Sequence, residues 1–264
     1  MTAEEVPLTG GDVHVGDDVV VRVGDTVRRP VGPHTPAVHA LLRHFEEVGL
    51  ERVPRVLGLD DRGREILTYV PGTPALAPVP AGDPLVFEIG AFLREMHDCQ
   101  ATFEPGNDAH WQRMVGAPAG GEVVCHNDLF WGNVVVTGGE LVGVIDWDLA
   151  APAPRLHDVA SAAMFWVPLR PDDQAQAWGL PTRARRERLV ALCDGYRLAG
   201  SDRSRLLDAV LEKAALAVAT SHGWGRDERR PGWAEMWDRD GDRYLVARDA
   251  WLEEHIDELR SWLA

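Results

Sequence analysis

Two short polar segments flank a stretch of sequence that is typical of a β-hairpin. The first, CHNDLFWGN, spans residues 125–133, and the second, IDWD, spans residues 145–148. Asp and Asn supply hard oxygen ligands, the kind that Mg²⁺ takes when it keeps waters and shares phosphate oxygens. The same residues also gather at turns, where they hydrogen-bond to the local backbone. The spacing of the polar residues therefore has to distinguish a metal and phosphate site from a simple turn.

The sequence between the two segments, NVVVTGGELVGV, predicts two strands joined by a tight turn at its paired glycines. With that turn, Asn133 faces Val144 across the hairpin. Asp146 then lies two positions further along the same face, at the diagonal spacing of roughly 7 to 8 Å. A slip of one residue in the register would remove this arrangement. The register predicts that Asn133 and Asp146 hold a metal ion together.

Three more polar residues adjoin this pair. Asp128 precedes Asn133 by five residues, where a carboxylate can accept the proton of an attacking hydroxyl or hold that hydroxyl in line. His126 is either a ligand or a structural donor, and we favour the structural role. Asp148 alternates onto the same face as Asp146, where it assists the metal or begins a helix. The set predicts a metal and phosphate site with an adjacent carboxylate.

The surrounding sequence, which must position these residues, begins with a small β-rich part. The stretches VVVRV at 19–23 and TVRRP at 26–30 predict a hairpin. The spacing of apolar residues predicts a helix over 36–48 that ends at Gly49. The stretch RVLGLDDRGREILTYV at 55–70 predicts two further strands.

A larger α-rich part follows. We expect a helix over about 84–98, then the hairpin, and then mostly helix, with a last helix over about 242–262. Proline and glycine are frequent at 71–84, which predicts a hinge or linker. The predicted domains are a β-rich lobe at 1–70, this linker, and a helical lobe with the hairpin at 85–264.

Composition and charge limit the possible partners. The chain has 264 residues, a formal net charge of −15 and an isoelectric point near 5.0, which argues against a nucleic-acid-binding protein. No apolar run approaches the ~20 residues of a membrane-spanning helix. The acidic start, MTAEEVPLTGGD, differs from a secretory leader, so a cytoplasmic protein is expected. The three cysteines form no CxxC pattern and indicate neither a disulfide framework nor a zinc site.

The run HNDLFWGN followed by GVIDWDLAAPAPRLHDVA resembles the signature of the aminoglycoside phosphotransferase family. These relatives of the protein kinases phosphorylate hydroxyl groups of antibiotics and small metabolites, and they usually have Gly where this chain has Asn127. The resemblance implies that Asp128 is the catalytic Asp and that Asn133 and Asp146 are Mg²⁺ ligands. Asp158 would be a structural Asp that ties down the following helix. The implied fold is α+β, bilobal and protein-kinase-like, and the implied cofactors are ATP or GTP and Mg²⁺.

The resemblance extends to the small lobe, which would bind the nucleotide. The stretch ILTYVPGTP is similar to the family's hinge, so Tyr69 and Val70 would lie near the adenine. Arg28 in TVRRP stands where the family has a Lys or Arg that pairs with the nucleotide phosphates, and Arg29 is its neighbour. An Arg can grip a phosphate through two parallel hydrogen bonds.

Two features of the family's small lobe have no clear counterpart here. A helix Glu usually orients the phosphate-binding cation, but Val38 or His39 stands at that position. The segment TGGDVHVGDDVVV has glycines where the phosphate-covering loop belongs, but it has no G-x-G-x-x-G pattern. The missing helix Glu motivates an alternative function, that of a catalytically weak kinase-like binding or immunity module.

The function that the sequence favours is transfer of the γ-phosphoryl group of ATP or GTP to a hydroxyl of a small molecule. An aminoglycoside or another aminated alcohol is the expected acceptor, and the oligomeric state stays open. A third reading starts from MHD at 96–98 and LHD at 156–158, because His-Asp pairs can bind two metals for phosphate hydrolysis. A metal-dependent phosphohydrolase of this kind would leave both polar segments unused.

Overall fold

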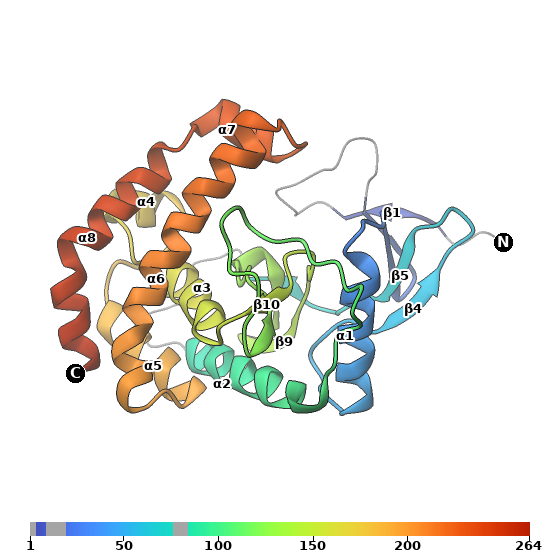
Figure 1. The fold of residues 1–264 in the computed structure, drawn as a ribbon, viewed down its shortest axis with the longest axis horizontal. Coiled ribbons are helices and arrows are strands. Elements are labelled where there is room, and N and C mark those ends of the chain that lie inside the picture. The colour runs from blue at the N-terminus through green and yellow to red at the C-terminus, as the bar shows by residue number, and fades with distance from the viewer. Residues whose placement is uncertain (1–3, 9–19, 76–83) are drawn as a thin grey trace.

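The protein consists of a small β-rich lobe and a larger helical lobe, with short strands between them (Figure 1). The computed structural model describes residues 4–8, 20–75 and 84–264. The predicted bilobal α+β arrangement is confirmed. In the described part of the chain, no helix is long and apolar enough to cross a membrane.

The small lobe is built on a five-stranded antiparallel sheet with the strand order β1-β2-β3-β5-β4. Its strands are β1 (Val6–Pro7), β2 (Val21–Val23), β3 (Thr26–Arg29), β4 (Val56–Leu59) and β5 (Glu65–Thr68). The predicted hairpin is β2 and β3, and Gly24 in its turn has a φ of +60°, which glycine adopts without steric cost. Val19, which the sequence also placed on this hairpin, lies outside the described residues.

Helix α1 (Thr35–Glu47) follows β3 and corresponds to the helix predicted over 36–48. Its side chains Leu41, Leu42 and Phe45 are fully buried, because their spacing places them on one face of the helix. They belong to an apolar core that continues into the large lobe. The chain turns away at Gly49, whose φ is +78°.

Short strands lie between the sheet of the small lobe and the helices. Strand β6 (Thr73–Pro74) pairs with β8 (Val134–Thr137), which pairs with β9 (Glu140–Val144). Separately, β7 (Val123–Cys125) pairs with β10 (Ala151–Ala153). Strand β6 lies in the segment predicted as a linker. The chain therefore passes from the small lobe to the large lobe through a strand of the three-stranded sheet β6-β8-β9.

Eight helices and three shorter helical turns are present in the described part of the chain. After α1, they are α2 (Pro84–Asp98), the 3₁₀ turns η1 (Cys99–Thr102) and η2 (Trp131–Asn133), α3 (Leu156–Trp166), α4 (Asp172–Ala177), α5 (Arg185–Tyr196), α6 (Gly200–Thr220), the π-helical turn η3 (Ser221–Asp227), α7 (Trp233–Asp240) and α8 (Arg243–Leu263). The bounds of α2 and α8 agree with the helices predicted over about 84–98 and 242–262.

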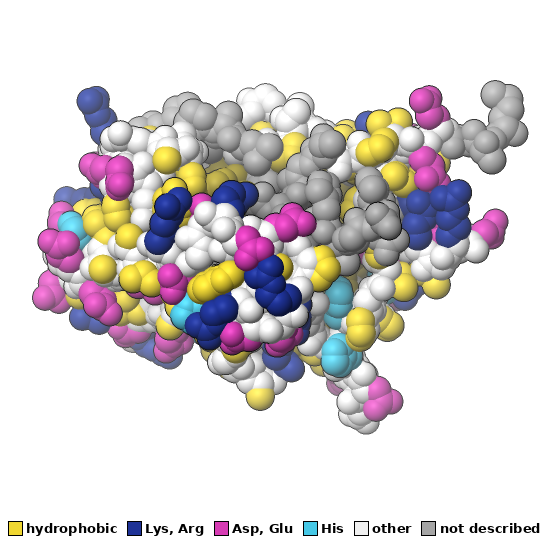
Figure 2. Space-filling model, turned by 90° about the horizontal axis from the view of Figure 1, so that it is seen from above, with side chains coloured by type: hydrophobic (Ala, Val, Ile, Leu, Met, Phe, Trp, Pro, Cys, Tyr) yellow, Lys and Arg dark blue, Asp and Glu magenta, His cyan; other side chains and the backbone are white. Residues whose placement is uncertain are grey.

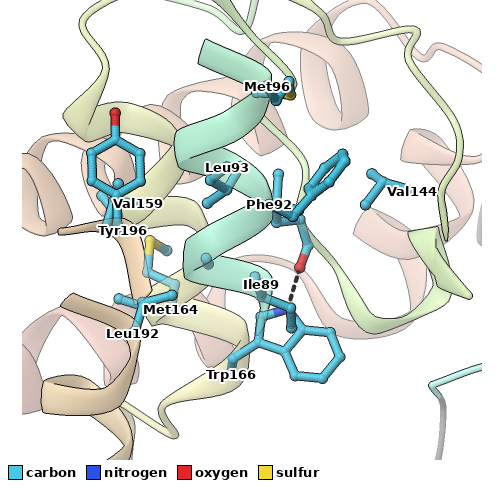
Figure 3. Packing of buried hydrophobic residues seen from close by; sticks show 14 of the residues in the cluster. Ile89, Phe92, Leu93, Met96, Val144, Val159, Met164, Trp166, Leu192 and Tyr196 are labelled. Atoms are coloured by element: carbon cyan, nitrogen blue, oxygen red, sulfur yellow. Dashed lines mark hydrogen bonds between the residues drawn. The ribbon is translucent and has the colours of Figure 1, made fainter. Parts of the chain in front are cut away.

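Helix α2 is the centre of the large lobe. Figure 3 shows Phe92 between α2 and Val144 of β9, with Leu93 and Met96 further along the same helix. All three α2 side chains are fully buried, and burial of one such side chain contributes about 1.5–3 kcal/mol. The core under the hairpin is therefore built largely by α2.

Helices α2 and α5 approach each other at the level of their backbones. A Cβ atom added at Gly90 would lie 2.4 Å from the carbonyl oxygen of Leu192, and one added at Gly195 would lie 2.1 Å from that of Phe87. Only glycine permits this separation. The close contact fixes α5 against α2, and α2 in turn supports the hairpin.

The surface charges are mixed. On the face shown in Figure 2, basic side chains are interspersed with acidic ones. Around α7, for example, Arg229 pairs with Asp238 at 2.6 Å and Arg230 pairs with Glu228 at 2.6 Å. Each of these ion pairs is exposed and therefore contributes little to stability.

Candidate functional site

Asp128 lies in the loop between β7 and the turn η2. The amide of Asn133 donates hydrogen bonds to the carbonyl oxygen of Asp128, at 3.0 Å, and to its carboxylate, at 2.9 Å. The structure thus brings the predicted catalytic Asp and a predicted metal ligand into contact. Burial raises the pKa of Asp128, and the negative charge of Asp146 raises it further.

The hairpin differs from its predicted register at one end. Val136 pairs with Leu141 as expected, but a β-bulge follows, so Val134 faces Val144 in place of Asn133. The prediction that Asn133 faces Val144 is wrong, because one extra residue on β9 shifts the pairing. Asn133 lies in the turn η2, and its carbonyl oxygen accepts a hydrogen bond from the backbone N–H of Ile145 at 2.8 Å. This bond, not strand register, joins Asn133 to the residue immediately before Asp146.

Asp146 is the second residue of the loop after β9 and has a φ of +63°, an uncommon conformation for a residue other than glycine. Its half-exposed carboxylate lies 3.3 Å from Nη1 of Arg29. Burial raises the pKa of Asp146, the Arg29 charge opposes that shift, and the carboxylate of Asp148 reinforces it. The left-handed backbone turns this carboxylate towards the small lobe.

Asp148 also contacts the small lobe. Its carboxylate pairs with the guanidinium of Arg29 and lies 3.3 Å from Nε2 of His34. Burial alone would raise the pKa of Asp148, but Arg29 and His34 lower it to about 2. Asp148 is therefore ionised at neutral pH and joins the two lobes.

Arg29, and not Arg28, reaches the site from strand β3. Successive residues of a strand point to opposite faces, and Arg28 bonds to Thr26 Oγ1 at 2.6 Å and lies 4.0 Å from Asp60. The structure therefore does not bring Arg28 together with the other predicted residues. Alternate residues of TVRR point to the same face of the strand. This alternation could have identified Arg29 once the face turned towards the large lobe was known.

The orientation of Arg29 depends on Glu65, which sequence reasoning missed. The two residues stand opposite each other on β3 and β5, and Arg29 Nε lies 3.0 Å from Glu65 Oε1. The other carboxylate oxygen of Glu65 lies 2.6 Å from Nε2 of His39 on α1. His39, one of the two residues that stand where the family has its helix Glu, thus contacts the cation through a Glu from the neighbouring strand.

His126 makes structural contacts. Its Nε2 donates to the carbonyl oxygen of Ile145 at 3.0 Å, and its Nδ1 lies 3.3 Å from the backbone nitrogen of Asp128. A carbonyl only accepts, so the proton lies on Nε2 and Nδ1 is the acceptor. The ring also packs edge-on against Trp147 at 4.7 Å. With both nitrogens occupied, the geometry agrees with the favoured structural role.

Asp158 lies in the first turn of α3, inside the helix it was expected to tie down. Its carboxylate accepts the backbone N–H of His126 at 2.8 Å and that of Asn127 at 2.7 Å, and lies 3.1 Å from Nε2 of His97. Burial raises the pKa of Asp158, but the His97 hydrogen bond and charge outweigh it, so the pKa is lowered. Asp158 therefore anchors the loop that carries Asp128.

The two predicted hinge residues contact different lobes. The backbone N–H of Tyr69 donates to Asp25 at 2.9 Å, and the Arg22 guanidinium lies 3.8 Å from the centre of its ring. Val70 packs so closely on Gly143 that a Cβ there would lie 2.7 Å from Val70 Cγ1. The segment TGGDVHVGDDVVV, expected to cover the phosphates, lies almost wholly outside the described residues.

The His-Asp pairs do not form a two-metal site. Nδ1 of His97 bonds to the hydroxyl of Tyr196 at 2.8 Å, whereas Asp98 points to the surface and pairs with Arg94 at 2.6 Å. His97 approaches Cys125 and Asp158 in the interior, but burial raises the pKa of that thiol well above its usual range. A buried, protonated thiol is a poor metal ligand.

Known proteins match both the sequence and the fold. Residues 107–189 match the model of the phosphotransferase enzyme family. A trifolitoxin immunity protein of Rhizobium leguminosarum bv. trifolii is 32% identical over 274 residues, which cover 99% of each chain.

Solved structures show the same fold at low identity. A choline/ethanolamine kinase family protein from Mesorhizobium loti has a TM-score of 0.62 at 16% identity, over 99% of this chain and 92% of that one. An amicoumacin kinase in complex with AMP-PNP and Ca²⁺ has a TM-score of 0.62 at 14% identity, over 93% and 90%. The chain belongs to the phosphotransferase enzyme family, a family of small-molecule phosphotransferases with the bilobal protein-kinase-like fold.

Proposed function

We propose that this protein transfers the γ-phosphoryl group of ATP or GTP to a hydroxyl group of a small molecule. Two contacts support this most: Asn133 donates to the Asp128 carboxylate, and Arg29 of the opposite lobe reaches the Asp146 carboxylate. An aminoglycoside or another aminated alcohol remains our candidate acceptor. The solved neighbours include kinases bound to AMP-PNP or ADP, which supports the use of a nucleotide.

The residues present fit Mg²⁺. Asp146 offers a half-exposed carboxylate. Asn133 commits its amide nitrogen to Asp128, which orients its side-chain oxygen away from that residue, and within the described chain that oxygen has no hydrogen-bond donor. Both ligands are hard oxygens, as Mg²⁺ requires. When bound there, Mg²⁺ would neutralise negative charge on the phosphates.

Side chains of the protein would bind the nucleotide and position the acceptor hydroxyl. Arg29 would contact the phosphates through its fork of N–H groups, with Tyr69 and Val70 near the base. Asp128 would accept a hydrogen bond from the acceptor hydroxyl and hold it in line with the phosphorus atom. Because the transition state of phosphoryl transfer is loose, positioning contributes more than basicity, so Asp128 need not be a strong base.

The test compares the wild-type protein with the Asp128→Asn variant, using nucleotide consumption and phosphorylated product across a panel of hydroxylated amines and sugars. We expect Asp128→Asn to lower turnover by about 10²- to 10⁴-fold while nucleotide binding persists. Asp98→Asn, at an exposed position outside the site, is the matched control. Equal turnover of wild type and Asp128→Asn would refute the assignment.

A binding or immunity module is the second candidate, and the 32% identity to a trifolitoxin immunity protein favours it. Such a module would hold its ligand without transferring phosphate. The same panel separates the two functions, because a module binds an acceptor equally well with or without nucleotide and yields no phosphorylated product.

A further inference from the structure

The chain contains a single lysine, and it is buried beneath the loop that carries Asp128. The chain has 27 lysine and arginine residues in total, and all of the others are arginine. Lys213 lies on α6 with 3% of its surface exposed. A sequence that uses arginine at every other basic position has kept here the smaller ammonium group, which is a compact point charge on a flexible stem.

The ammonium of Lys213 contacts Asn127, the residue immediately before Asp128. Its Nζ lies 3.2 Å from the carbonyl oxygen of Asn127 and 3.3 Å from the side-chain oxygen Oδ1. Its remaining contact is with the sulfur of Met114 at 3.7 Å. Within the described residues no carboxylate lies at ion-pair distance from Lys213, so both oxygens that accept its hydrogen bonds belong to Asn127.

Asn127 itself has an unusual conformation that these contacts stabilise. Its φ is +68°, a region in which Asn is tolerated better than most residues. Its amide nitrogen donates to the carbonyl oxygens of Leu149 at 3.1 Å and Cys125 at 3.3 Å. A glycine could adopt the same φ but could offer none of these side-chain hydrogen bonds. Asn127 and Lys213 therefore form one unit that replaces a simple glycine turn.

Lys213 is almost wholly shielded from water, whereas Asn127 is partly exposed. The neighbouring cavity, lined by Asn127, Lys213, Arg113 and His157 among others, has a volume of only about 10 Å³, which is room for one water at most. Burial lowers the pKa of Lys213, whereas the nearby carboxylates of Asp158 and Asp128 raise it. The buried ammonium is thus held by the two oxygens of Asn127 and by the sulfur of Met114.

We propose that Lys213 is a positioning residue, which fixes the backbone before Asp128 through Asn127 and so aims the Asp128 carboxylate at the acceptor hydroxyl. This inference rests on the proposed phosphotransfer. Helix α6 is itself held in place at its end, because Thr220 Oγ1 accepts the backbone N–H of Val115, in the segment before β7, at 3.0 Å.

The kinetic test uses Lys213→Met, which keeps the length of the side chain but removes its charge and N–H groups, and Asn127→Gly, which keeps the turn but removes Oδ1. We expect Lys213→Met to lower kcat by about 10- to 100-fold through misplacement of Asp128, with KM for the nucleotide and its directly measured Kd unchanged. Arg205→Met, on the exposed side of the same helix, is the matched control. A kcat for Lys213→Met within about twofold of the wild type would overturn the proposal.

The double variant tests whether the two residues act through one contact. We expect kcat of the double variant, Lys213→Met with Asn127→Gly, to lie within about twofold of kcat of Lys213→Met alone. The effects of two substitutions are not additive when the two residues share one interaction. If the fold losses in kcat of the two single variants multiplied in the double variant, the two residues would act independently, which would contradict a shared contact between Lys213 and Asn127. Lys213→Arg should also lower kcat, since the cavity of about 10 Å³ beside Lys213 has little room for the wider guanidinium.

A readout without turnover separates this proposal from the proposed function. As the only lysine, Lys213 gives a single Nζ signal in a protein labelled with isotopic lysine. We expect Asn127→Gly to shift that signal, and Lys213→Met to speed hydrogen exchange at the amides of Asn127 and Asp128 by at least about tenfold. If neither changes, the proposal is wrong whatever the activity. If both change but the wild type transfers no phosphate, the proposed function fails and the contact stands.

Discussion

Arg29 and Glu65 stand directly opposite each other on neighbouring strands of the small lobe, with Nε and Oε1 3.0 Å apart. In protein kinases, a Glu on the helix after the third strand orients the phosphate-binding cation. Here that Glu comes from β5, and the helix supplies His39, which contacts Glu65 at 2.6 Å. In place of a single helix Glu, two residues in contact, Glu65 and His39, thus lie beside Arg29.

The Arg29–Glu65 pair gives the first prediction. Glu65→Gln removes the charge that holds the guanidinium, so Arg29 should pair more strongly with Asp146 and Asp148 and be less available to phosphates. We expect KM for the nucleotide to rise about tenfold, the effect of losing about 1.4 kcal/mol of binding. Glu46→Gln, an exposed change on α1, should leave KM unchanged. An unaltered KM in Glu65→Gln would show that Arg29 does not depend on Glu65.

Arg28 and Arg29 allow a comparison between neighbouring residues. Arg29→Ala should lower kcat/KM by at least about 100-fold, since it removes a charge-assisted contact to the transferred group. Arg28→Ala should change kcat/KM by less than about threefold, because Arg28 faces Asp60 on the other side of the strand. Steady-state kinetics with varied nucleotide measures both. The reverse order of effects would restore Arg28 as the phosphate-binding residue.

Asp146 is expected to set the requirement for metal. Asp146→Asn keeps the shape of the side chain but replaces a carboxylate with a weaker amide ligand. We expect the Mg²⁺ concentration for half-maximal turnover to rise by at least about tenfold, and removal of Mg²⁺ by a chelator to abolish turnover in the wild type. Titration of activity with Mg²⁺ measures this. The same Mg²⁺ dependence in both proteins would exclude Asp146 as a ligand.

The ionisation of Asp158 should make the free energy of unfolding depend on pH. Its folded-state pKa is lowered from the usual 3.8, so its ionised form stabilises the fold above that value, and this stabilisation is lost as the pH falls through the folded-state pKa. At pH 7 we expect Asp158→Asn to lower the free energy of unfolding by about 3 kcal/mol, as the loss of one member of a buried charged network does.

The check on Asp158 is urea denaturation from about pH 7 down to about pH 3. The wild type should lose stability steeply at the acid end, and Asp158→Asn should lose less over the same interval. Parallel curves would mean that Asp158 is not responsible for the acid sensitivity. Asp98→Asn, whose carboxylate is exposed, serves as the reference.

Local patterns in the sequence predicted several of the elements correctly. The turn at Gly24 and the helices Thr35–Glu47, Pro84–Asp98 and Arg243–Leu263 follow from apolar spacing and turn residues that lie close together in the chain. The bulge in β9 could not be predicted in this way, because an extra residue in one strand is decided by packing against both faces. It moved the register at Asn133 while leaving the pairing next to the turn intact.

Contacts between distant residues explain what else was missed. Arg29 and Glu65 are 36 positions apart, and Lys213 lies 86 positions from Asn127. A single sequence gives no information about which of several charged residues meet across such distances. To decide whether Arg28 or Arg29 points towards Asp146, one needs to know which face of β3 is turned to the large lobe. That face becomes known once the strand is placed in its sheet.

The contacts of Arg29 with Asp146 and Asp148 have a mechanical consequence. One guanidinium, carried by the small lobe, neutralises carboxylates that belong to the large lobe. A cation that bound those oxygens would weaken the contact that Arg29 makes between the two lobes. Closure of the lobes and binding of a metal at Asp146 and Asp148 would then be coupled, because both draw on the same carboxylates.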